Sequence, residues 1–73
     1  MADEPLDLAG LPTFVDHEDQ WGTSGYAWDG RHVVSWYEDR KEQTEGVSHR
    51  LEPERFLDGS ASDAAKAWLR ALL

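Results

Sequence analysis

Hydrophobic and polar residues alternate along three stretches of the chain, 24–28, 31–38 and 47–51. A period of two is typical of β-strands, which present successive side chains to opposite faces of a sheet. Asp29 and Gly30 separate the first two stretches, and an Asp-Gly pair supplies the positive φ angles that a two-residue type I′ turn requires. The pattern therefore predicts a hairpin from 24–28 and 31–38, followed by a third strand at 47–51.

The two-residue turn sets the pairing of side chains across this sheet. Extended to the third strand, it predicts these opposite pairs: Trp28–Arg31, Tyr26–Val33, Ser24–Ser35, Tyr37–Val47 and Val33–Leu51. One face then carries the larger apolar side chains: Tyr26, Trp28, Val33, Tyr37, Val47 and Leu51. The opposite face carries a smaller set: Ala27, His32, Val34, Trp36 and Arg50, with Trp21 beside it.

The C-terminal part of the chain has a helical pattern. Pro53, in the segment 52–57, suits the first position of a helical turn because that position needs no amide donor. Ser60 and Asp63 fit a capping box at the start of a longer helix. Apolar residues then recur at spacings of three and four and form one helix face: Ala61, Ala64, Ala65, Trp68, Leu69 and Leu72. We expect this helix to cover the sheet face with the larger apolar side chains.

Together these elements predict an α+β fold, an antiparallel β-meander of three strands with one C-terminal helix packed on one face. A short strand candidate at 13–15 makes the meander four-stranded if it joins the sheet. We expect residues 13–73 to form a single small domain and residues 1–12 to form an acidic tail. Two alternatives are open for this tail: Leu8 and Leu11 attach it to the domain, or the whole segment is mobile.

One helix covers only one face of a sheet, so the face with Trp36 and Val34 has two interpretations. In the first, Phe14, Leu8 and Leu11 fold over it and form a second small core. In the second, the face stays exposed as a docking patch, since a Trp side chain combines a large contact area with a polar handle. The sequence leaves both interpretations open.

Negative charge is concentrated at the front of the 73-residue chain. The formal net charge is -8, and residues 1–30 contain seven acidic residues without a single Lys or Arg. Such a surface repels nucleic acid and anionic lipid and attracts basic proteins. We therefore expect a protein partner with a basic surface, no direct nucleic-acid binding and no membrane contact; the alternative is that the charge serves solubility alone. The acidic segment 16–19 is predicted to be a turn.

Candidate chemistry is sparse. The chain has no Cys, which excludes disulfides and thiolate metal sites. The segment 16–19 lacks the alternating ligands of a calcium loop, and no nucleophile elbow supports a catalytic triad. We therefore expect no enzyme activity, no cofactor and no metal. The N-terminal residues lack the pattern of a secretory signal and no apolar run reaches about 18 residues, so a cytoplasmic location is expected.

These features predict a small acidic, non-catalytic protein-binding module, an adaptor or an inhibitor, that uses an exposed aromatic sheet face and an acidic turn. The predicted partner-binding residues are an aromatic anchor and an acidic rim: Trp36, Trp21, Val34, Asp16, Glu18 and Asp19. Two alternatives belong to other classes. One is a nucleic-acid-mimicking inhibitor of a basic DNA- or RNA-binding protein, and the other is an obligate homodimer with a structural role.

Overall fold

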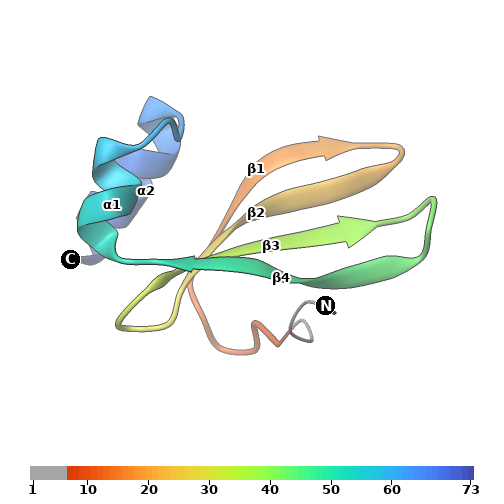
Figure 1. The fold of residues 1–73 in the computed structure, drawn as a ribbon, viewed down its shortest axis with the longest axis horizontal. Coiled ribbons are helices and arrows are strands. Elements are labelled where there is room, and N and C mark those ends of the chain that lie inside the picture. Colours follow the sequence, from red (N-terminus) through yellow and green to blue (C-terminus); the bar gives the residue numbers. More distant parts are fainter. Residues whose placement is uncertain (1–6) are drawn as a thin grey trace.

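Strands that are neighbours in the sequence are also neighbours in one antiparallel sheet (Figure 1). A computed structural model describes residues 7–73. The sheet order is β1-β2-β3-β4: β1 Thr13–Asp19, β2 Gly22–Trp28, β3 Val33–Asp39 and β4 Thr44–Leu51. Two short helices follow: α1 Pro53–Asp58 and α2 Asp63–Leu72. The predicted α+β meander is confirmed, with the strand candidate at 13–15 as the start of the fourth strand.

The first strand is longer than predicted and includes the acidic segment 16–19, so the prediction of a turn there is wrong. The register of β1 against β2 shifts between Val15 and His17, which makes Asp16 the extra residue of a β-bulge. β1 is an edge strand, and charged side chains are acceptable at an edge because they reach water and discourage pairing with another chain. Its acidic character therefore does not prevent strand formation.

The loop from β2 to β3 contains four residues, 29–32, rather than the predicted two. Oδ1 of Asp29 accepts hydrogen bonds from the backbone N–H groups of Arg31 at 2.8 Å and His32 at 2.7 Å. Asp29 thus caps the loop with its side chain instead of taking a type I′ turn conformation. Of these four residues only Gly30 has a positive φ, +97°.

The longer loop changes the hairpin register. Trp28 pairs with Val33 and Tyr26 pairs with Ser35, so the predicted pairs of Trp28 with Arg31 and of Tyr26 with Val33 are wrong by two residues. A slip of one residue would turn every side chain to the other face, but a slip of two does not. The predicted division of the hairpin residues between the two faces therefore holds.

The pairing of β3 with β4 agrees with the prediction at only one end. Leu51 lies opposite Val33 as predicted, whereas Val47 lies opposite Trp36 and not opposite Tyr37. The register shifts because β4 has one extra, bulged residue between these two positions. Val47 consequently belongs to the sheet face opposite the one predicted for it.

The two helices begin at different kinds of residue. α1 begins at Pro53, as predicted. α2 is capped by Ser62, whose side chain accepts a hydrogen bond from the backbone N–H of Ala65 at 3.2 Å, so the predicted capping box at Ser60 is wrong. Both serines satisfy the sequence rule for a cap, but Ser60 lies in the short link between the helices.

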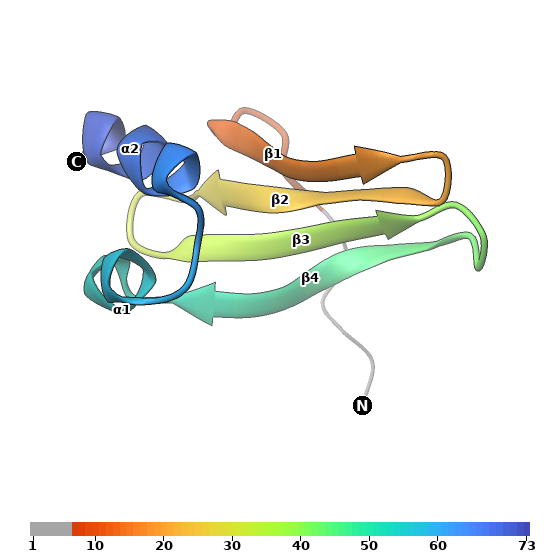
Figure 2. The same ribbon diagram turned by 90° about the horizontal axis from the view of Figure 1, so that it is seen from above.

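The helices pack on the predicted face, at one end of the sheet (Figures 1 and 2). The buried centre of this core consists of one strand residue and three helix residues: Val33, Phe56, Ala65 and Leu69. Aromatic pairs surround it, with the Tyr26 ring 4.8 Å from that of Phe56 and the Phe14 ring 5.8 Å from that of Trp68. Phe14 is thus part of the helix-side core and not of a cover over the opposite face.

The opposite face carries a second apolar cluster: Ala27, Val34, Trp36 and Val47. Leu8 and Leu11 pack against it, and the exposed fraction is only 6% for Trp36 and 2% for Val34. The interpretation of a second small core therefore holds for the two leucines. Trp36 and Val34 lie beneath this cover and do not form an exposed docking patch.

Each core occupies part of the sheet, and the other end of the sheet projects beyond the helices (Figure 2). The β1–β2 and β3–β4 turns lie at this projecting end (Figures 1 and 2). Among residues 7–73, no helix is long and apolar enough to cross a membrane.

Candidate functional site: a groove at the hairpin tips

The projecting end of the sheet carries a shallow groove, which we call the tip groove. Its lining comes from β1, from β3 and from the two turns, and the side chains that matter below are His17, Asp19, Trp21, Tyr37, Asp39 and Lys41. His17 and Asp19 are separated from Tyr37, Asp39 and Lys41 by about twenty positions in the sequence. They meet because β2 pairs with both β1 and β3.

Small residues of β2 also line the groove, namely Gly22 and Ser24. Gly22 lies between Asp19 of β1 and Asp39 of β3 in the ladder. A Cβ atom at position 22 would collide with the carbonyl oxygen of Glu38. Position 22 therefore requires glycine, and no side chain of this β2 residue stands between the two aspartates.

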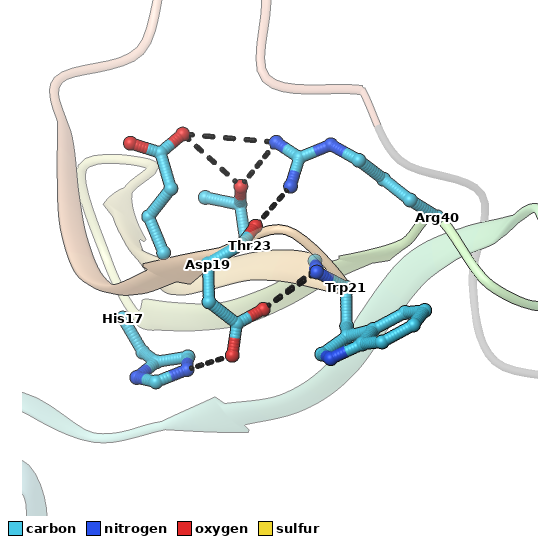
Figure 3. A network of polar contacts seen from close by, with 7 residues as sticks. His17, Asp19, Trp21, Thr23 and Arg40 are labelled. Atoms are coloured by element: carbon cyan, nitrogen blue, oxygen red, sulfur yellow. Dashed lines mark hydrogen bonds and ion pairs between the residues drawn. The ribbon is translucent and has the colours of Figure 1, made fainter.

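The β1–β2 turn is organised by Asp19. Its Oδ1 accepts hydrogen bonds from the backbone N–H groups of Trp21 at 2.8 Å and Gly22 at 3.0 Å, and its Oδ2 lies 2.9 Å from Nε2 of His17 (Figure 3). Two hydrogen bonds lower the pKa of Asp19: the bond from His17 has the larger effect, and the bond from the Trp21 amide adds to it. The carboxylate therefore carries a negative charge at neutral pH beside the indole ring.

Arg40 ties the two turns together on the other side of the sheet from His17 (Figure 3). Its guanidinium donates to the carbonyl oxygen of Asp19 at 2.6 Å and to Oγ1 of Thr23 at 2.8 Å. It also lies 3.7 Å from the Glu18 carboxylate, and its backbone N–H donates to the carbonyl oxygen of Trp21 at 2.8 Å. The backbone on both sides of the Trp21 side chain is thus fixed by polar contacts.

Trp21 is the most exposed of the tryptophans. Its exposed fraction is 57%, whereas that of Trp36 is 6%, and Trp28 and Trp68 are half-buried in the helix-side core. Leaving such a large aromatic surface in water gives up the stabilisation that burial would provide. Burial of the Trp21 ring against a partner would therefore provide stabilisation that the fold itself does not obtain from this side chain.

The β3–β4 turn repeats the construction of the β1–β2 turn. Oδ1 of Asp39 accepts hydrogen bonds from the backbone N–H groups of Lys41 at 3.0 Å and Glu42 at 3.1 Å. Gln43 adopts a positive φ of +56° before the chain enters β4. This arrangement fixes the Asp39 carboxylate and the backbone of Lys41 beside the groove.

The six predicted partner-binding residues separate into three groups of two. Asp19 and Trp21 both line the tip groove. Asp16 is the exposed bulge residue of β1, and Glu18 faces away from the groove toward Arg40. Trp36 and Val34 are buried in the second core.

Sequence reasoning missed the β3 side of the groove. Tyr37, Asp39 and Lys41 line it together with Trp21. Tyr37 was predicted on the helix-covered face, and the other two residues lie between the predicted strands 31–38 and 47–51. The available signal was the alternation along β3, which places Tyr37 and Asp39 on one face. The sheet face around Tyr37 and Asp39 is uncovered because the two helices are too short to reach it (Figure 2).

No family model, curated protein or solved structure matches this chain. The chemistry of the tip groove is therefore interpreted from its own residues. The groove combines two aromatic rings, two carboxylates and one ammonium group with the small β2 residues Gly22 and Ser24. This combination suits the binding of a group that is partly polar and partly apolar. Within residues 7–73 no group of three or more His, Cys, Asp or Glu side chains is placed to hold a metal ion.

Proposed function

We propose that this protein is a small, non-catalytic protein-binding module whose contact surface is centred on the tip groove. The observation that carries the proposal is the 57% exposure of Trp21 on a turn whose backbone is fixed by Asp19 and Arg40. Trp is enriched at the energetic centres of protein interfaces. Because the turn is already ordered, this chain loses little conformational entropy there when a partner binds.

Charge supports a basic partner. The net charge is -8, and Asp16, Glu18 and Asp19 follow one another closely on the exposed edge strand β1. A field of this sign accelerates encounter with positively charged surfaces and falls with added salt. The contact of the Trp21 ring would then set the lifetime of the complex.

The test is capture of partners from a native lysate by the immobilised protein and by its Trp21→Ala variant. We expect recovery of the partner to fall at least tenfold in the variant, the loss typical of a central interface Trp. Leu73→Ala is the control, because Leu73 is an apolar residue of similar exposed fraction (64%) outside the groove. Unchanged recovery by a folded Trp21→Ala protein would refute the proposal.

A second measurement separates a foreign partner from a second copy of this chain. Sedimentation over a range of concentrations reports self-association directly. A dimer that dissociates on the Trp21→Ala change would identify the partner as the same chain, whereas a monomer throughout leaves the partner as another protein.

A further inference from the structure

We propose that the tip groove receives an arginine side chain of the partner. The inference rests on the proposed function and specifies the chemistry that the groove recognises. Three observations support it: two aromatic rings line the groove, two carboxylates flank its open centre, and one lysine stands at its rim.

The aromatic rings favour a flat cation. Trp21 and Tyr37 line the same groove, which is shallow rather than deep. A guanidinium group is planar and weakly hydrated, so it can lie on an aromatic face and gain cation–π attraction without a deep cavity. A lysine ammonium is compact and strongly hydrated and gains less from an open surface.

The carboxylates favour a positive charge at the centre of the groove. Asp19 and Asp39 lie on either side of Gly22 in the sheet, and position 22 cannot hold a side chain. Each turn uses Oδ1 of its aspartate to accept the loop amides, and Oδ2 of Asp19 also contacts Nε2 of His17 at 2.9 Å. The negative charges are therefore fixed in position before a ligand arrives, and a guanidinium between them can form charge-assisted hydrogen bonds.

Lys41 supplies an opposing charge that makes the inference testable in both directions. Lys41 is one of the residues that line the groove, so its ammonium group is near enough to repel a bound guanidinium. Removing a carboxylate should weaken binding of a cation, and removing this ammonium should strengthen it. A merely structural role for either residue predicts no such pair of opposite effects.

The experiment is an NMR titration of the full chain, labelled with ¹⁵N, with Nα-acetyl-L-argininamide as the probe. The indole N–H signals of the four tryptophans are observed together, so Trp36, buried in the second core, is an internal control. We expect a saturable shift of the Trp21 signal and none of the Trp36 signal. The neutral isostere Nα-acetyl-L-citrullinamide should give no saturable shift, and Nα-acetyl-L-lysinamide a weaker one.

Matched variants test the charges. We expect Asp39→Asn to weaken the probe's binding about threefold, the size of one exposed ion pair, and Lys41→Gln to strengthen it about threefold. The Asn side chain can still accept the turn amides, and Lys41→Gln leaves the Asp39 cap untouched. Asp29→Asn, which removes the same charge from the equivalent loop at the opposite end of the sheet, should have no effect.

The inference is overturned if the citrulline or lysine probe shifts Trp21 as strongly as the arginine probe, or if Asp39→Asn and Asp29→Asn behave alike. Such a result, combined with loss of partner capture in Trp21→Ala, would leave the protein-binding function standing with a different ligand group. If the arginine probe gives no saturable shift of the Trp21 signal in the parent protein and Trp21→Ala captures the partner as well as the parent does, both proposals are removed together.

Discussion

At the residue scale, three aspartates spaced ten residues apart organise the three hairpin loops. In Asp19, Asp29 and Asp39 the Oδ1 atom accepts the backbone N–H groups of the residues two and three positions further on. A short side chain that accepts local amides is a common way to close a turn. Part of the negative charge at the front of the chain therefore serves the fold, whether or not a partner is present.

Asp29→Ala should lower the free energy of unfolding by about 1 kcal/mol, because the amides of Arg31 and His32 lose their acceptor. Asp29→Asn should retain most of that stability, since its amide oxygen can still accept. Urea denaturation monitored by far-UV circular dichroism measures both values. Asp16→Ala removes the same charge from an exposed position that caps no loop, and an equal loss in that variant would contradict the explanation.

The same carboxylates predict a loss of stability in acid. Hydrogen bonds lower the pKa of Asp19, chiefly the one from His17, and that of Asp29, chiefly the one from the His32 amide. A carboxyl group with a lowered pKa in the folded state stabilises the fold above its unfolded pKa of about 3.9, and this stabilisation is lost as the pH falls through the folded value. The free energy of unfolding, measured between about pH 2 and pH 6, should decrease as the pH is lowered. The decrease should be less steep in Asp29→Asn. Equal slopes would show that the loop hydrogen bonds do not control the acid response.

The candidate site was only half predictable from single residues. Asp19 could be predicted because it belongs to the acidic segment 16–19, and Trp21 because it follows that segment two residues later. Tyr37 and Lys41 could not, because only the length of the helices leaves their end of the sheet uncovered (Figure 2). Trp36 was preferred as an anchor on the basis of its face alone, and no local pattern shows that Leu8 and Leu11 cover it.

At the scale of elements, face assignments were predicted better than pairings. The slip of the β2–β3 hairpin by two residues leaves each side chain on its face, whereas the bulges at Asp16 and Ser48 reverse the alternation beyond them. A bulge has no dependable sequence signature here, since neither residue is a glycine. Alternation alone therefore places Val47 on the wrong face, although it predicts the strand itself.

Gly25 gives a prediction about the packing of adjacent strands. A Cβ atom at this position would collide with the carbonyl oxygen of Phe14 and would lie 3.0 Å from Cζ2 of Trp36. Gly25→Ala should therefore destabilise the fold by about 2 kcal/mol, a typical cost of overpacking. Chemical denaturation provides the measurement, with Ser24→Ala as the control at the neighbouring groove position. A stability within about 0.5 kcal/mol of the parent, the usual scatter of neutral substitutions, would show that the strands separate without cost.

At the scale of the whole molecule, part of the sheet is covered by packed segments and part of it remains exposed to solvent. The helices cover one face at one end, the segment with Leu8 and Leu11 covers part of the other face, and the hairpin tips remain open (Figures 1 and 2). A small domain has little apolar surface to bury, so both covers are needed for stability. The residues that line the open end belong to neither core.

The double variant Leu8→Ala, Leu11→Ala tests this division. Both side chains are half-buried against the second core, so their loss should lower the free energy of unfolding by about 2 kcal/mol. The Nε1 atom of Trp36 is buried without an acceptor among residues 7–73, so hydrogen exchange of its indole N–H should accelerate once water reaches it.

The exchange of the Trp21 indole and its response to the arginine probe should remain as in the parent, because the tip groove lies outside the second core. The paired variant Leu72→Ala, Leu73→Ala removes two exposed leucines and should change neither stability nor Trp36 exchange appreciably. If Trp36 exchange stays slow in the Leu8→Ala, Leu11→Ala protein, the two leucines do not form the cover. If the Trp21 response is lost as well, the hairpin tips depend on the second core and the sheet behaves as one cooperative unit.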